Sequence, residues 1–155
     1  MKLNVLCVIS ILLGTLLQAQ VNIESLRDSE TSTGLYHHLD LGLSLLKGNS
    51  EHVKYNLEYR ADYIKETSSW LLISKFNKGT SKDITYIERG FIHLRLTKPI
   101  TTITALEVFA QEEYDKFINL NERKLLGIGT RFGFFNNVYL GTGLMWEEEN
   151  IKNEG

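Results

Sequence analysis

Residues 51–63 read EHVKYNLEYRADY, and apolar and polar side chains alternate along the whole stretch. Side chains of a β-strand point to opposite faces in turn, so this pattern predicts a strand with one apolar and one polar face. The apolar positions are Val53, Tyr55, Leu57, Tyr59, Ala61 and Tyr63, and the polar positions are Lys54, Asn56, Glu58, Arg60 and Asp62. The stretch is about twelve residues long, against about five or six in an ordinary strand. It matches the roughly 9–11 tilted residues with which a strand of a β-barrel crosses a membrane.

The first twenty residues predict an exported protein. Lys2 precedes an apolar run over residues 3–17, and Ala19 is a small residue near the expected cleavage point. This order is typical of a cleaved secretory signal peptide. The apolar run is about fifteen residues long, and a transmembrane helix needs about twenty. We therefore expect a signal peptide over residues 1–20 and a single mature domain over residues 21–155.

Composition narrows the classes of function. The 155 residues are 43% hydrophobic and 23% charged, which suits one domain. The single cysteine, Cys7, lies in the apolar run, so the mature chain is predicted to form neither a disulfide nor a thiolate metal site. With 17 basic and 19 acidic residues the charge balance is mildly acidic, which disfavours nucleic acid as a partner. We expect no cofactor and no bound metal.

The rest of the chain continues the extended pattern. Strands are predicted near residues 35–45, 51–63, 69–76, 84–97, 100–114, 122–134 and 138–147. The facing of the third is left open because Leu71, Leu72 and Ile73 are all apolar, and residues 77–83 are expected to form a loop. The fold class is therefore all-β, an antiparallel up-and-down meander of about seven strands. Since a closed bacterial barrel has an even number of strands, we expect an incomplete barrel whose C-terminal strands are missing.

The strand ends suggest how such a barrel would sit in a membrane. Connections on the periplasmic side, near residues 64–68, 97–99 and 135–137, are expected to be shorter than those on the outer side. Aromatic side chains near the strand ends predict two girdles at the membrane interfaces. These aromatic residues are Tyr63, Trp70, Phe134 and Tyr139 at one edge and Phe76, Tyr86, Tyr114 and Trp146 at the other.

Two longer segments carry a resemblance to a known family. Residues 39–51 read LDLGLSLLKGNSE, and residues 94–134 read LRLTKPITTITALEVFAQEEYDKFINLNERKLLGIGTRFGF. The chain resembles the YdiY-like family of salt-induced outer-membrane proteins, a domain of unknown function. The resemblance implies an outer-membrane barrel with a role in the envelope under salt stress. It implies no catalytic residue, because its motifs mark strands and turns.

The polar faces of the strands form the candidate site. The interior of a barrel of about eight strands is just wide enough to be filled by side chains, so opposite charges there are expected to pair and plug the lumen. The candidate members of this polar network are His38, Asp40, Lys54, Asn56, Glu58, Arg60, Asp62, Glu107, Arg123 and Arg131. The alternative is a small pore for solutes, lined by the same charges.

Other functions are weaker alternatives. His38 and Asp40 share a face and could form part of a lipid-modifying enzyme, but no third group is fixed by spacing, so we expect no enzyme. Adjacent His37 and His38 point to opposite faces and cannot share a metal ion. A soluble lipocalin-like barrel would turn the apolar faces inward around a ligand. The expected partners are outer-membrane lipid, lipopolysaccharide and the barrel-assembly machinery.

Six acidic residues lie near the predicted outer end of the strands. They are Glu112, Glu113, Asp115, Glu147, Glu148 and Glu149. These carboxylates either keep the loops solvated or bridge to lipopolysaccharide through divalent cations, which prefer oxygen ligands.

Overall fold

The computed structural model describes residues 32–48, 51–82, 84–134 and 138–152. These residues form seven antiparallel strands and one short 3-10 helix, so the predicted all-β meander is confirmed. The elements are β1 (Gly34–Leu46), β2 (His52–Lys65), β3 (Ser68–Ser81), β4 (Ile84–Pro99), β5 (Thr104–Asp115), η2 (Lys116–Ile118), β6 (Leu120–Gly133) and β7 (Tyr139–Ile151). The predicted signal peptide lies outside the described residues.

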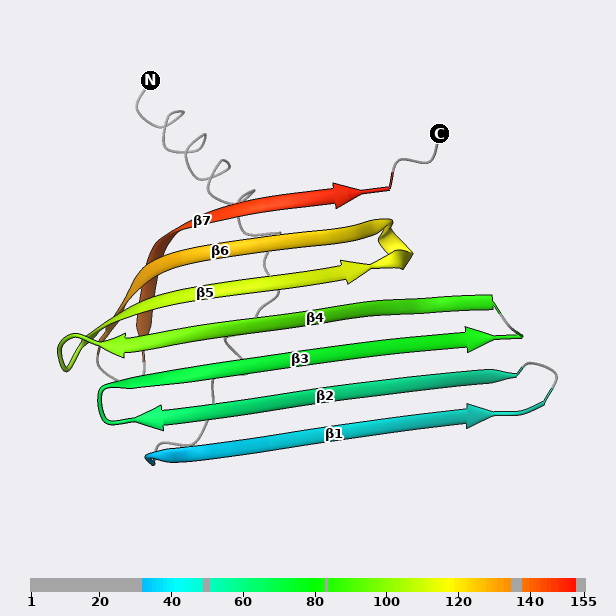
Figure 1. Ribbon diagram of the computed structural model, residues 1–155, viewed down its shortest axis with the longest axis horizontal. Coiled ribbons are helices and arrows are strands. Elements are labelled where there is room, and N and C mark those ends of the chain that lie inside the picture. The colour runs from blue at the N-terminus through cyan, green and yellow to red at the C-terminus, as the bar shows by residue number, and fades with distance from the viewer. Residues whose placement is uncertain (1–31, 49–50, 83, 135–137, 153–155) are drawn as a thin grey trace, which may run out of the picture.

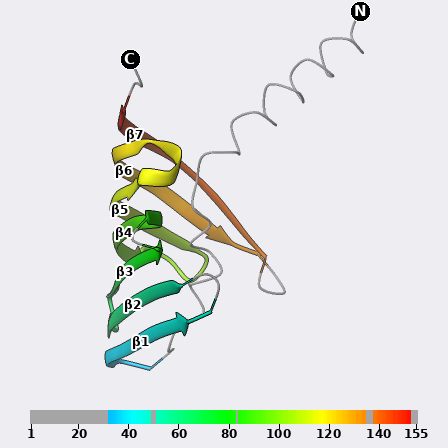
Figure 2. The same ribbon diagram turned by 90° about the vertical axis from the view of Figure 1, so that its right-hand side faces the viewer.

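The strands form one sheet in the order of the sequence, with β1 and β7 at its edges (Figure 1). Each strand is hydrogen-bonded to the next, and Leu41 pairs with Leu57 between β1 and β2. The sheet is bent, because β6 and β7 swing away from the stack of β1 to β4 (Figure 2). It does not close into a barrel, which is consistent with the incomplete barrel expected from the sequence.

Two strands, β3 and β7, extend well beyond their predicted ends. β3 continues through the expected loop to Ser81, because that segment pairs with both β2 and β4, as in the pairs Asn56–Asn77 and Asn77–Arg89. β7 continues through the acidic run to Ile151, because this run pairs with β6. In both cases, hydrogen bonding across the sheet overrides a local preference for turns or solvent.

The expected difference in loop length between the two ends is not found. Residues 66–67, 100–103 and 134–138 connect strands at one end of the sheet, and residues 47–51, 82–83 and 116–119 connect them at the other. The fifth strand begins at Thr104 rather than at residue 100, since the backbone NH groups of Ile100 and Thr101 both donate to the carbonyl of Thr104 to form the turn. Loop length therefore gives no orientation.

The two faces of the sheet differ in composition and in burial. The apolar face carries residues such as Leu41, Leu126 and Leu144, whose exposed fractions are 68%, 54% and 80%. The polar face carries His93 and Asp62, which are only 0% and 7% exposed. The chain thus leaves its hydrocarbon side chains accessible and crowds its polar ones together. A water-soluble domain does the reverse with most of its large apolar residues.

The strand register shows which residues of β3 lie on each face of the sheet. Leu71 and Ile73 lie buried on the polar face, where Ile73 pairs with His93 of β4. Leu72 therefore points to the apolar face, like Leu94 of the neighbouring strand. Leu125 of β6 is also buried on the polar face, so apolar side chains help to fill a surface that is mainly polar.

On the polar face, an aromatic ring packs so closely against a glycine that a larger residue would not fit without a shift. A Cβ atom on Gly127 would lie 2.2 Å from the ring of Phe109 on the paired strand. We expect Gly127→Ala to lower the free energy of unfolding by about 1–3 kcal/mol, because the ring has to move. Gly141→Ala is the control, since its Cβ would have no atom within 4 Å. Urea unfolding of both variants measures the difference, and equal stabilities would contradict the packing described here.

Candidate functional site

The ten residues of the predicted polar network all lie on the polar face, given the strand register. Two groups of contacts can be distinguished on this face. One group of contacts joins β2 to β3, and a larger one joins β4 to β7. The two groups lie on different strands of the sheet.

The smaller group pairs charges locally. The guanidinium of Arg60 donates to both carboxylate oxygens of Asp62, at 2.6 and 3.0 Å, and both side chains are largely buried. Glu58 forms an ion pair with Lys75 of β3 at 2.9 Å. Lys75 was not among the predicted members, because its strand had no assigned facing at the level of the sequence.

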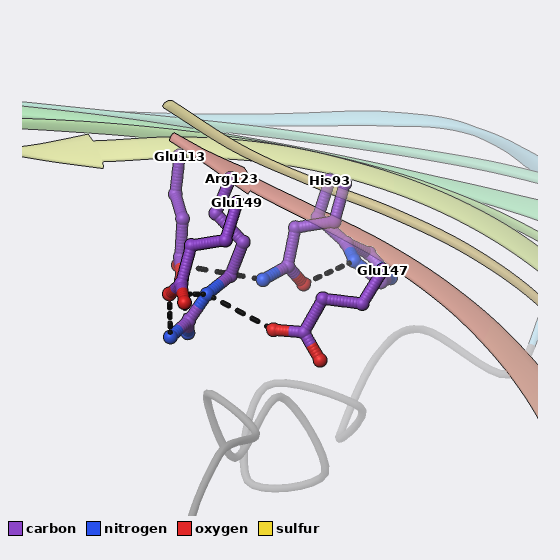
Figure 3. A network of polar contacts seen from close by, with 6 residues as sticks. His93, Glu113, Arg123, Glu147 and Glu149 are labelled. Carbon is purple, nitrogen blue, oxygen red and sulfur yellow. Dashed lines mark hydrogen bonds and ion pairs between the residues drawn. The ribbon is translucent and has the colours of Figure 1, made fainter. Parts of the chain in front are cut away.

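The larger group has Arg123 at its centre, and we call it the arginine–glutamate cluster. Arg123 forms ion pairs with Glu113 at 2.8 Å, Glu147 at 3.2 Å and Glu149 at 2.6 Å (Figure 3). The register makes this possible, because Arg123 of β6 pairs with Glu113 of β5 on one side and Glu149 of β7 on the other. One cation thus holds three carboxylates from two neighbouring strands.

A hydrogen-bonded path extends the arginine–glutamate cluster to β4. The amide NH₂ of Gln111 approaches Glu113 at 3.4 Å, and its amide oxygen accepts from Nδ1 of His93 at 3.1 Å. The imidazole of His93 is stacked on Phe91 and Phe109, at 6.1 and 5.6 Å between ring centroids. This polar path therefore crosses four strands, and it is buried at His93 and Gln111 and exposed at its β7 end (Figure 3).

The remaining predicted members on β1 and β2 are less enclosed. His38 and Asp40 are exposed on the edge strand, opposite Arg60 and Glu58 of β2. Lys54 and Asn56 lie further along β2, opposite Ser44 and Gly42. Within the described ranges, no group of three or more His, Cys, Asp or Glu side chains is placed to hold a metal ion.

The predicted acidic group at one end of the sheet is divided between the two faces. Glu113, Glu147 and Glu149 lie on the polar face with Arg123. Glu112 and Glu148 both pair with Lys124 in the register and lie on the apolar face. The alternation of a strand separates neighbours in the sequence, so the six carboxylates do not form one cluster.

The opposite end of the polar face contains Arg95, Glu107 and Arg131. The guanidinium of Arg131 lies 3.7 Å above the ring centroid of Tyr139, a cation–π contact. Tyr139 is thus on the polar face, and the prediction that it belongs to a membrane-interface girdle is wrong. Tyr63 and Trp70, which pair with each other on the apolar face, remain exposed as that prediction requires.

A comparison with known families identifies the chain. Residues 39–145 match the family model described as "Protein of unknown function, DUF481". The chain belongs to the DUF481 family. DUF481 is the YdiY-like family, so the resemblance found in the sequence is confirmed. No curated protein and no solved structure matches the chain.

Three buried polar residues of this DUF481 chain were missed by the sequence analysis. They are His93, Arg95 and Gln111, which lie on β4 and β5. The alternation of side chains along β4 could have identified the two that lie there. Arg89, Phe91, His93 and Arg95 share one face of residues 84–97, while Ile92 and Leu94 share the other. Within the described part of the DUF481 chain, no helix has the length and apolar character needed to span a membrane.

Proposed function

We propose that this DUF481 protein forms the wall of an outer-membrane β-barrel and serves the envelope under salt stress without acting as an enzyme. The observation that carries the proposal is the contrast between the faces: Leu41 is 68% exposed, and the polar His93 is fully buried. Lipid acyl chains would cover the exposed hydrocarbon. In water, such a broad apolar surface would favour aggregation.

The height of the apolar face supports this environment. On β4, the outward positions between Glu88 and Lys98 are occupied by a glycine and three aliphatic residues, Ile92, Leu94 and Leu96. At about 3.4 Å per residue these ten steps span about 34 Å. Tilted by about 45°, the segment is about 24 Å high, close to the apolar band of about 25 Å on outer-membrane barrels.

Charged side chains mark one border of this band. Glu88 forms ion pairs with Lys116 and, at 3.6 Å, with Lys78. On the same face Lys124 forms an ion pair with Glu122 at 2.7 Å. We propose that these groups lie at the level of the lipid headgroups, where lipopolysaccharide is the partner on the outer leaflet. Insertion would require the barrel-assembly machinery of the envelope.

The polar face favours a plugged interior over an open pore. Arg123 is held by three carboxylates, and the path from Glu113 to His93 is mostly buried. Oppositely charged side chains that bind one another fill a narrow barrel. A conducting filter instead presents its charges to passing ions.

In the alternative, a soluble lipocalin-like barrel, the sheet would have to curve so that its apolar face lines the interior. Its apolar side chains would have to become the buried ones. In the described residues the fully or nearly buried side chains of the sheet centre, such as His93, Gln111 and Ile73, belong to the polar face. The exposed His38 and Asp40 give no support to catalysis.

Cell fractionation tests the proposed location. We expect the protein in the outer-membrane fraction after a carbonate wash, and a shift in electrophoretic migration on heating, because folded barrels unfold only when heated in detergent. Cells lacking the protein should take up more of an impermeant dye than the parent at high sodium chloride. Recovery as a soluble periplasmic protein would refute the location, and equal dye uptake would refute the role under salt stress.

A further inference from the structure

The polar face contains a hollow of about 410 Å³ between β4 and β7, near the turn at residues 100–103. Side chains from four strands line it, among them Arg95, Glu107, Phe109, Arg131, Tyr139 and Met145. It lies at the opposite end of the strands from the arginine–glutamate cluster. Arg123 and its three glutamates do not line it.

The described residues that line the hollow carry a net positive charge. They include two guanidinium groups, of Arg95 and Arg131, and one carboxylate, of Glu107. The other end of the same face has the opposite sign, since one arginine there meets three glutamates. Guanidinium groups bind carboxylate and phosphate through paired N–H donors. An anion therefore fits the hollow better than a cation.

The shape of the hollow depends on residues without side chains. Gly129, Gly141 and Gly143 line it, and a Cβ atom on Gly141 would meet no atom within 4 Å. The aromatic rings of Phe109 and Tyr139 supply flat walls. Tyr139 already holds the guanidinium of Arg131 over its ring at 3.7 Å, which fixes the direction of that group. The space is thus open, has aromatic walls and contains an oriented cation.

We propose that this hollow is a binding site for a compact organic anion, with a phosphate or carboxylate head and a flat apolar body. The head would lie at Arg95 and Arg131, and the body would pack between Phe109, Tyr139 and the glycine backbone. The site is formed by one face of β4–β7 and does not depend on the location of the protein in a membrane.

Calorimetric titration of the full mature chain in a non-ionic maltoside detergent tests the proposal. Phenyl phosphate and benzoate share the flat body and differ in the head, inorganic phosphate has the head alone, and benzylammonium has the body with a positive charge. We expect phenyl phosphate and benzoate to bind, inorganic phosphate to bind at least about tenfold more weakly than phenyl phosphate, and benzylammonium not to bind. Equal binding of benzylammonium and benzoate would overturn the proposal.

Two glycine variants locate the binding. Gly141→Leu places a side chain in the hollow, and its Cβ would have no atom within 4 Å. No described glycine has a positive φ, so the backbone accepts a side chain there. We expect this variant to bind phenyl phosphate at least about tenfold more weakly than the parent. Gly48→Leu is the matched control, because a Cβ at Gly48 also meets open space but lies outside the hollow. Unchanged phenyl phosphate affinity in folded Gly141→Leu would overturn the proposal.

Arginine variants test the charge. Arg131→Gln is expected to bind phenyl phosphate about tenfold more weakly than the parent. Arg89 lies on the same face but outside the hollow, so Arg89→Gln should bind phenyl phosphate like the parent. Circular dichroism confirms that each variant is folded, and Gly141→Ala, with a smaller side chain, should give an intermediate affinity. Binding of phenyl phosphate by a protein recovered in the periplasm would support the site and refute only the membrane location.

Discussion

Replacing Leu126 with arginine is expected to lower the free energy of unfolding in phospholipid vesicles by about 2–4 kcal/mol. Leu126 is 54% exposed on the apolar face and pairs with Ala110 and Trp146, near the middle of the apolar band. In lipid, the guanidinium would have to enter hydrocarbon or distort the bilayer around it. Urea unfolding in vesicles, followed by tryptophan fluorescence, measures the loss.

The same substitution separates a lipid environment from an aqueous one. An exposed leucine in water can become arginine with a change within about 0.5 kcal/mol. Leu126→Met, which keeps the side chain apolar, is the matched control and should unfold like the parent in vesicles. A Leu126→Arg protein as stable in vesicles as the parent would contradict the assignment of this face to lipid.

Replacing Arg123 with methionine is expected to lower the free energy of unfolding by about 3–5 kcal/mol, because three carboxylates would lose their shared cation. Arg123 is only 19% exposed, and Glu113 12%, so water screens the charge of Glu113 poorly. Glu147 and Glu149 would then repel Glu113 across the polar face. Urea unfolding in the same vesicles gives the magnitude.

The neighbouring lysine supplies the control. Lys124 also pairs with a glutamate, Glu122 at 2.7 Å, but the two side chains are 46% and 42% exposed. Lys124→Met should therefore cost at most about 1 kcal/mol, as is usual for a surface ion pair. Adding Glu113→Gln to Arg123→Met should restore part of the stability. Equal losses for the two single variants would show that burial does not strengthen the arginine–glutamate cluster.

Alternation along the strands was enough to predict the meander, and it failed where the pattern is ambiguous. In β2 each apolar residue alternates with a polar one, so both the strand and its faces follow from the sequence. In β3, Leu71, Leu72 and Ile73 are compatible with either facing, and the choice depends on which side chains fill the polar face beside His93. That packing is a tertiary property. The end of β3 at Ser81 likewise depends on pairing with two neighbours.

For the candidate site, the sequence predicted the face but not the contacts. Alternation places Arg60 and Arg123 on the same side of the sheet, yet their partners depend on strand register. Arg123 meets Glu149 because β6 and β7 form a hairpin in which these residues are paired, 26 positions apart. Arg60 instead binds Asp62, two residues along its own strand. The hollow beside Tyr139 is lined by residues of four strands, and their arrangement cannot be read from the pattern of a single strand.

The position of β1 and β7 at the two edges of an antiparallel sheet has a consequence for assembly. Because seven strands alternate in direction, the first and the last run the same way. Joining them directly would create a parallel seam, whereas a wholly antiparallel cylinder requires an odd number of intervening strands, contributed by this polypeptide or by another. If the sheet lies in a membrane as we propose, backbone amides and carbonyls at both edges must in either case find hydrogen-bonding partners, because lipid offers none.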